Sequence, residues 1–218
     1  RSSATRRTFN NYAEYALDYA KAGLYEEALR LLKRFESEQN NHAVNPLCYY
    51  YTGWLFMQLK DPASAKIYFD KGASAPADYC FPSKTEDVMI LKAAIEVNPS
   101  DAKAYYYLGN YWYAHNNHTE AISCWEKSSH IDDQFPTVFR NLSLAYYNKL
   151  HDKSNSLAAM EKAFRLDPAD ARVLMELDQL YKQLNYCHWE RLQALEFHAH
   201  LTEQSHDLYL ERVTLYNQ

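Results

Sequence analysis

Residues 101–133 contain two helical patterns separated by a short polar break at residues 115–118. The first pattern places four residues on one helical face: Tyr105, Leu108, Gly109 and Trp112. The second places three residues on one face: Ala121, Trp125 and Ser128. The small residues Gly109 and Ala121 would let the two backbones approach closely, while one tryptophan on each helix would fill the space beside this contact. The stretch therefore predicts one antiparallel helix pair, which cannot bury both of its faces alone.

The same pattern recurs along the chain, and such internal repetition decides the fold of a sequence before any other signal. Leu142 lies 34 residues after Leu108, whereas Ser156 lies 35 residues after Ala121. We expect the extra residue in the polar turn at 151–153, where an insertion would disturb no packing. Further copies of the pattern fall on Leu177 and Tyr181, on Tyr49, Gly53, Phe56, Ala65 and Phe69, and on Tyr12, Ala16, Tyr19, Ala28 and Leu32.

These residues resemble the tetratricopeptide repeat family, whose pattern is aromatic-x2-Leu-Gly-x2-aromatic, followed by alanine, a large apolar residue, alanine and proline. Pro99 and Pro168 end their units as repeats of that family end. The resemblance covers most of the chain and is weakest after Tyr181, where Glu190-Arg191 stands at the place of a small residue. It implies an all-α fold, a right-handed superhelix (α-solenoid) of antiparallel helix pairs, with about five repeats, one half-repeat and a terminal helix.

The expected layout is one solenoid over residues 1–218. Its parts are repeats near 9–37, 46–73, 102–133, 136–168 and 171–203, a half-repeat at 84–99 and a terminal helix at 206–217. Residues 73–83 contain two prolines and no helical stripe, so a loop replaces the first helix of the half-repeat. We expect this loop to fill the gap, with a functional loop as the alternative. Thr85 is the expected N-cap of the helix that follows. The chain reads as an excerpt of a larger protein.

Composition narrows the classes of function. The net charge of −5 gives no basic face for nucleic acid, and no run of about 18 apolar residues would span a membrane. The four cysteines are isolated from one another and read as small core residues of a reduced protein, so a cytoplasmic location is favoured. Four glycines are far fewer than the about fifteen of an average chain of this length, which argues against a fold rich in sheets or loops.

The family resemblance implies a peptide-binding groove lined by the first helices of the pairs. Read onto this chain, the candidate groove residues are Tyr50, Trp54, Lys103, Tyr106, Asn110, Tyr113, Arg140, Asn141, Tyr147 and Arg172. Aromatic side chains with amide and basic groups between them suit the binding of a peptide. Some members of the family hold a terminal carboxylate over three successive repeats. Asn110, Asn141 and Arg172 match that pattern, but Tyr106 and Glu176 depart from it, and a glutamate would repel the carboxylate.

No pattern in the sequence predicts catalysis, a cofactor or a metal. There is no glycine-rich phosphate loop and no nucleophile elbow. The histidines near the C-terminus, His188, His198, His200 and His206, miss the spacing of four that places two ligands on one helical face. We therefore interpret the nine histidines as surface residues and expect no enzyme activity.

The sequence thus predicts a protein-interaction module that binds a peptide or protein segment. A narrower resemblance suggests an alternative. Residues 78–82 and 105–110 resemble the repeat portion of large bacterial multidomain proteins of unknown function, which have β-rich, carbohydrate-related domains upstream. In that reading the array is a structural arm that packs against its own upstream domain. Self-association through the unfinished terminal helix is a third hypothesis.

Overall fold

The chain folds into α-helices, and the computed structural model describes residues 2–39, 44–78 and 80–217, with no strand among them. Residues 40–43 and Tyr79, which belong to the expected loops, lie outside the described part. The expected all-α fold built from helix pairs is confirmed. Contacts within the chain separate it into two compact units, residues 1–131 and 132–218, and each is described by itself. The single solenoid and its handedness stay predictions.

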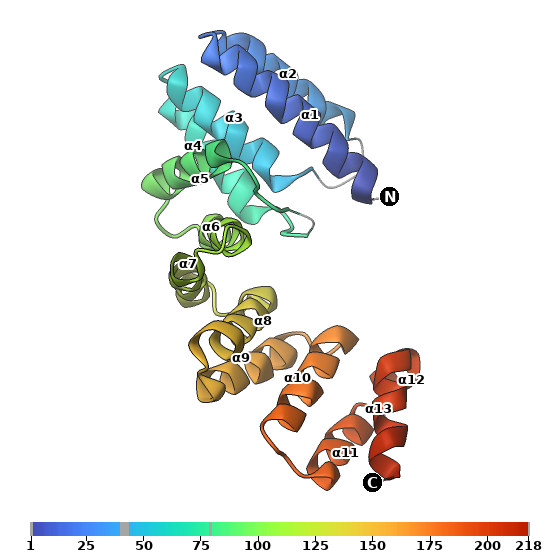
Figure 1. The fold of residues 1–218 in the computed structure, drawn as a ribbon. Coiled ribbons are helices and arrows are strands. Elements are labelled where there is room, and N and C mark those ends of the chain that lie inside the picture. Colours follow the sequence, from blue (N-terminus) through green and yellow to red (C-terminus); the bar gives the residue numbers. More distant parts are fainter. Residues whose placement is uncertain (1, 40–43, 79, 218) are drawn as a thin grey trace. The chain divides into compact units, whose positions relative to one another are not determined.

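The first unit contains three helix pairs and one unpaired helix (Figure 1). Its helices are α1 (Ser2–Lys21), α2 (Tyr25–Glu38), α3 (Pro46–Gln58), α4 (Pro62–Ser74), α5 (Thr85–Val97), α6 (Ala102–Ala114) and α7 (His118–Ile131). The pairs are α1 with α2, α3 with α4, and α6 with α7. Pro46 and Pro62 each begin a helix. The backbone N–H at this position makes no hydrogen bond within the helix, so proline, which lacks it, loses nothing there.

Small residues allow close approach within these pairs. An added Cβ at Gly109 would lie 2.4 Å from the Trp125 indole, and one at Gly53 would lie 2.6 Å from the Phe69 ring. The partner residue Ala121 is fully buried. The glycine face of one helix therefore rests directly on the large aromatic residue of the other, as the repeat pattern predicts.

The first helix of every pair ends on a residue with a left-handed backbone. Gly23 was expected there and has φ +78. The same role falls to Lys60, Asn116, His151 and Asn185, whose φ values lie between 55 and 63. After four of these residues, the next backbone N–H bonds to the carbonyl five residues earlier, as Asn117 does to Trp112 over 2.9 Å. This contact closes the helix end and turns the chain into the second helix.

The remaining turn, at His151, holds the extra residue of this repeat. The sequence placed that insertion at residues 151–153, and this prediction was wrong. Asp152 N–H bonds over 3.0 Å to the carbonyl of Tyr146, which lies six residues earlier instead of five. The helix widens into a π-turn over Tyr146–Leu150, so the insertion lies inside the last turn of the helix and not in the polar turn at 151–153. His151 then takes the same left-handed conformation as its counterpart Asn116.

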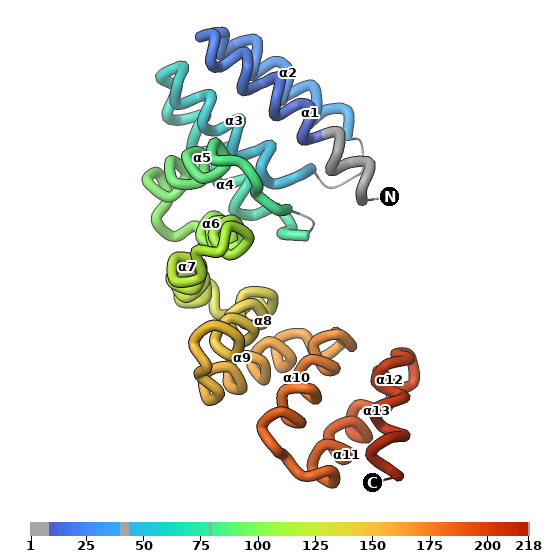
Figure 2. Tube along the Cα trace, viewed as in Figure 1, coloured from blue at the N-terminus to red at the C-terminus, as the bar shows by residue number. Residues whose placement is uncertain are grey.

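The described part of the segment between α4 and α5 contains no helix (Figure 2). A buried tyrosine and a buried carboxyl group hold its end in place. The Tyr51 hydroxyl donates to Asp87 over 2.6 Å, and Asp87 also accepts from the backbone N–H groups of Ser83 and Lys84. The N-cap of α5 is therefore Lys84, and the expectation that Thr85 caps this helix was wrong by one residue. Cys80 is buried at 1% exposure, so the described part of the loop contributes to the core.

The second unit begins with a regular pair and ends with an irregular one. Its elements are α8 (Pro136–Ala145), the π-turn, α9 (Lys153–Leu166), α10 (Ala171–Gln183), α11 (His188–Phe197), α12 (Ala199–Gln204) and α13 (His206–Tyr216). In the regular pair, Ser143 of α8 donates to the backbone carbonyl of Ser156 on α9 over 2.7 Å. The helix expected to continue through Thr202 is broken at His198, where the Thr202 hydroxyl donates to the carbonyls of Leu195 and His198.

Candidate binding site

Two of the candidate groove residues lie in the core of the first unit. Tyr50 is fully buried, and its hydroxyl donates to Asp101 over 2.9 Å. Burial and the neighbouring carboxyl group raise the pKa of Tyr50 well above its usual value, so the hydroxyl stays a donor. Tyr106 is 6% exposed, and its ring lies 5.4 Å from that of Tyr107. Neither side chain presents a surface to a partner.

The other four candidates in the first unit are half-buried. Trp54 lies on α3, whereas Lys103, Asn110 and Tyr113 lie along one face of α6. Lys103 donates to the backbone carbonyl of Ala75, so it fastens the start of the loop. Asn110 accepts a hydrogen bond of 3.2 Å from Trp125, and the Tyr113 ring lies 5.3 Å from the same indole. The core residue Trp125 therefore positions Asn110 and Tyr113, and part of each of these side chains remains exposed.

In the second unit, two candidates form one charged cluster. Arg140 on α8 donates to both oxygens of Glu176 on α10, over 2.6 and 2.5 Å, and the side chains are 16% and 24% exposed. Arg172 reaches the same carboxylate over 3.3 Å. A carboxylate of the protein thus already occupies the guanidinium of Arg140, which argues against the capture of a terminal carboxylate there. Asn141 and Tyr147, which follow Arg140 in the sequence, are half-buried.

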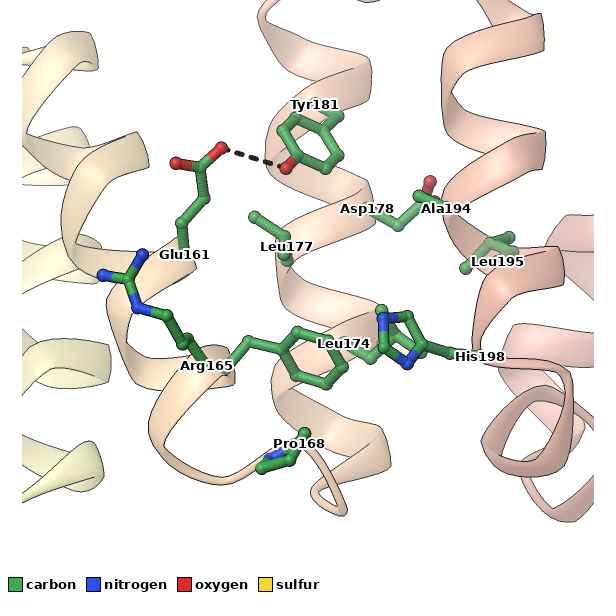
Figure 3. Close-up of a pocket in the computed structure, with 11 residues that line it drawn as sticks. Glu161, Arg165, Pro168, Leu174, Leu177, Asp178, Tyr181, Ala194, Leu195 and His198 are labelled. Carbon is green, nitrogen blue, oxygen red and sulfur yellow. Dashed lines mark hydrogen bonds between the residues drawn. The ribbon is translucent and has the colours of Figure 1, made fainter.

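The second unit also contains an apolar pocket that the sequence did not predict (Figure 3). It has a volume of about 370 Å³ and lies between α9, α10 and α11. We call it the α10 pocket; its lining residues are Glu161, Phe164, Arg165, Pro168, Leu174, Leu177, Asp178, Tyr181, Ala194, Leu195 and His198. Phe164, Leu174, Leu177 and Leu195 belong to the buried core of the unit, so the floor of the pocket is rigidly packed.

The pocket exists because α10 and α11 approach each other less closely than the helices of the other pairs. At the position where the second helix of the other pairs has a small residue, α11 has Arg191. The facing position on α10 holds Asp178, where α3 and α6 have glycine and α8 has serine. Its guanidinium donates to Asp178 over 3.0 and 2.6 Å and to Glu211 of α13 over 2.6 Å. The side chains of Arg191 and Asp178 are 2% and 3% exposed. A long side chain between the helices holds them apart, and α11 packs mainly on α13.

Polar groups surround the mouth of the α10 pocket. The Tyr181 hydroxyl donates to Glu161 over 3.0 Å, and burial followed by this carboxylate raises the pKa of Tyr181. The His198 imidazole meets the Phe164 ring edge to face at 4.8 Å. Burial, together with the nearby His200, lowers the pKa of His198, so the ring is neutral at pH 7. In Figure 3, His198 reaches in from the side opposite to Glu161 and Arg165.

The sequence did contain one signal for this pocket. Glu190-Arg191 stands where the repeat pattern has a small residue, and this departure indicated a weak repeat. A buried arginine also needs a buried acid, and Asp178 departs from the same pattern on the preceding helix. Two compensating departures on facing helices would have indicated an altered contact between α10 and α11.

Two further sequence expectations can be placed. Cys48, Cys80 and Cys124 are buried as expected, but Cys187 is exposed and accepts a hydrogen bond from Glu190 N–H at the start of α11, so its expected core position was wrong. On α13, the exposed apolar side chains are Tyr209, Leu210, Val213 and Tyr216. Self-association through this helix stays a prediction. In the described part of the chain, no helix has the length and apolar character needed to cross a membrane.

The sequence was compared with family models and with known proteins. The family model described as "Tetratricopeptide repeat" matches residues 90–129, which cover most of α5, all of α6 and most of α7. This match supports the resemblance of the chain to tetratricopeptide repeat proteins. Tetratricopeptide repeat protein 37 of Xenopus laevis is 25% identical over 175 residues, which is 74% of this chain. This chain spans only 11% of the length of that relative.

One solved structure supports the helical-repeat fold, and a second is similar in coverage alone. PilF of Pseudomonas aeruginosa has a TM-score of 0.50 at 17% identity and covers 99% of this chain and 85% of its own. A tetratricopeptide repeat protein of Thermus thermophilus, TTC0263, has a TM-score of 0.49 at 14% identity over 96% of this chain and 99% of its own. Tetratricopeptide repeat proteins are in general protein-interaction scaffolds, which supports a generic protein-binding role.

Proposed function

We propose that this tetratricopeptide repeat protein is an interaction module that holds a peptide or protein segment along the first helices of its pairs. Two observations support the proposal most: the surface of α6 in the first unit and, separately, the surface of α8 and α10 in the second. Each helix buries one face in its unit, and candidate groove residues lie half-exposed on α6 and α8 and exposed on α10. The contacts in the first unit are Trp54, Lys103, Asn110 and Tyr113; those in the second are Arg140, Asn141, Tyr147 and Arg172.

The chemistry of this surface favours a partner segment with both apolar and polar side chains. Trp54 and Tyr113 offer large, stiff contact areas that lose little entropy on binding. Arg140 is fixed in place by Glu176, so its remaining surface is already oriented before a partner arrives. Since this guanidinium is shared with Glu176, we expect affinity to depend on internal side chains of the partner and not on its terminal carboxylate.

The test begins with peptides selected from a random library on the intact chain. We expect Trp54→Ala and Arg140→Ala to weaken binding of the selected peptides by about five- to tenfold, the usual effect of a central contact. Trp189→Ala and Arg30→Ala are the matched controls, because these residues are 63% exposed overall and 74% exposed at the side chain, on second helices. Circular dichroism should show unchanged helicity in all four. Equal affinity for wild type, Trp54→Ala and Arg140→Ala would contradict the proposal.

The alternative is a structural arm that packs against an upstream, carbohydrate-related domain of the same protein. This alternative predicts a different response to the same substitutions. Trp54→Ala and Arg140→Ala would then lower the unfolding free energy of the longer protein, and no peptide selected on the isolated chain would depend on either residue.

A further inference from the structure

α3 is buried on more sides than its pairing with α4 explains. Its sequence, PLCYYYTGWLFMQ, contains no charged residue. The Cys48 thiol lies 3.8 Å from the Leu32 carbonyl of α2, and Gly53 lies against the Phe69 ring of α4. A further side of the helix carries Tyr51, which is only 2% exposed. A helix that is apolar on every side needs a neighbour on every side, so this further side must also be covered.

The side of α3 around Tyr51 is covered by α5, which packs against both α3 and α6 (Figure 1). Asp87 in the first turn of α5 accepts a hydrogen bond of 2.6 Å from the Tyr51 hydroxyl. Further along α5, Leu91 and Ala94 are fully buried. Trp54 lies about one turn after Tyr51 on this side of α3 and stays half-buried. α5 therefore covers this face of α3 as far as the candidate groove residue Trp54.

Two ion pairs connect the start of α5 to α1. Lys84 pairs with Glu14 over 3.0 Å, and Lys21 pairs with Glu86 over 3.1 Å. Glu14 and Lys21 lie about two turns apart on one side of α1, and their opposite charges fit α5 in one orientation. The start of α5 thus reaches from α3 to α1, the first helices of the first two pairs. These side chains are 27% to 64% exposed, so the two ion pairs can break without opening the core.

We propose that α5 is an internal occupant of the groove in the first unit, and that a partner segment has to displace it to cover α3 from Tyr51 to Trp54. α5 lies on α3 as a helical ligand would. It belongs to neither the α1–α2 pair nor the α3–α4 pair, so both pairs stay intact when it leaves. The competition with a partner rests on the proposed function, whereas the opening of α5 does not.

Hydrogen exchange measures this opening without any partner. In the wild type, the amides of Leu91 and Ala94 on α5 should exchange at least about tenfold faster than those of Leu55 and Phe56 on α3. Their rates should also depend less on urea, because a helix that opens alone exposes less surface than a unit that unfolds. Equal rates with equal urea dependence on both helices would overturn the proposal, since α5 would then open only together with α3.

Charge reversal tests the two ion pairs. The double variant Lys84→Glu, Glu86→Lys sets like charges against each other in both pairs and should accelerate exchange at Leu91 by at least about fivefold. The matched fourfold variant adds Glu14→Lys and Lys21→Glu, which restores both pairs with exchanged charges. Its exchange should return to within about twofold of the wild type. Circular dichroism should show equal helicity in all three proteins. Unchanged exchange in the double variant would contradict the proposal, as would acceleration that persists in the fourfold variant.

The competition is measured with those selected peptides whose binding weakens in Trp54→Ala. Exchange and binding both need α5 to be displaced, so the double variant should bind these peptides more tightly by the factor by which its exchange accelerates. The fourfold variant should bind them like the wild type. Equal affinity of the wild type and the double variant, with accelerated exchange, would overturn the competition. Peptides that never depend on Trp54 would instead contradict the proposed function, and the exchange rates would still decide whether α5 opens alone.

Discussion

The Arg191 guanidinium donates to both carboxylate oxygens of Asp178, over 3.0 and 2.6 Å, across the interface between α10 and α11. In two preceding pairs the corresponding position of the first helix holds a small residue: Gly109 lies against Trp125, and Ser143 bonds to Ser156. The ion pair therefore takes the place of a close contact between two backbones. It keeps the last pair folded while leaving the α10 pocket beside it.

The first prediction concerns this buried pair. Arg191→Ala should lower the unfolding free energy by about 3–5 kcal/mol, because it leaves the buried Asp178 without its ion-pair partner. Asp178→Ala should cost less, because Arg191 keeps its bond to Glu211. The double substitution Asp178→Ala, Arg191→Ala should cost clearly less than the sum of the two, since it removes both charges together. Urea denaturation of the four proteins measures the coupling. Simple additivity would show that the pair does not hold the helices in place.

A second prediction tests the close contact of the central pair. Gly109→Val should lower the unfolding free energy by about 1–3 kcal/mol, because the new Cβ would lie 2.4 Å from the Trp125 ring. The control Ala114→Val introduces the same β-branched residue at an exposed position of the same helix and should cost less than about 0.5 kcal/mol. Equal midpoints of urea denaturation for the two variants would be inconsistent with this contact.

The third prediction concerns the segment between α4 and α5. Tyr51→Phe removes the donor to Asp87 in the core, so it should cost about 1.5–3 kcal/mol, the usual contribution of a hydrogen bond to a charged group. Hydrogen exchange at Ser83 and Lys84 should accelerate, since Asp87 also holds these amides. Tyr12→Phe is the control, because its bond to Glu38 is exposed and should contribute about 0.5 kcal/mol or less. Unchanged exchange would mean that Asp87 does not fasten the loop.

A fourth prediction follows from the lowered pKa of His198. A base whose pKa is lower in the folded than in the unfolded state binds fewer protons when folded. Its stabilising contribution is complete above the unfolded pKa of about 6.5 and is lost as the pH falls through the lowered folded value. Stability should therefore decrease between pH 7 and pH 5, and His198→Gln should flatten that dependence. The exposed control His206→Gln should leave the slope unchanged; the same slope in both variants would exclude His198 as its source.

The helix pairs could be predicted from the sequence because their contacts depend on residue size. Gly109, Ala121 and Trp125 define the approach of two helices without reference to any distant part of the chain. The left-handed end of α1 was predictable for the same reason, since Gly23 accepts that conformation freely. Lys60 and His151 adopt it as well, and nothing in those side chains indicates it.

The burial of Tyr50 and the α10 pocket could not be predicted, because each depends on a helix that is missing or displaced. Tyr50 occupies a groove position in the repeat pattern, but the half-repeat lacks its first helix, and α6 packs against α4 instead. Asp101 and Tyr107 then enclose the Tyr50 side chain in the core. The α10 pocket arises in a similar way, because its volume depends on how far Arg191 separates two helices and not on any single residue type.

The most direct test of the central claim is a crystal structure of the double variant Asp178→Ala, Arg191→Ala beside that of the wild type. With small residues restored on both helices, α11 should move onto α10, and the space between Leu177 and Leu195 should close. A pocket of about 370 Å³ that persists in the double variant would contradict the account, because α10 and α11 would then be held apart by something other than the ion pair.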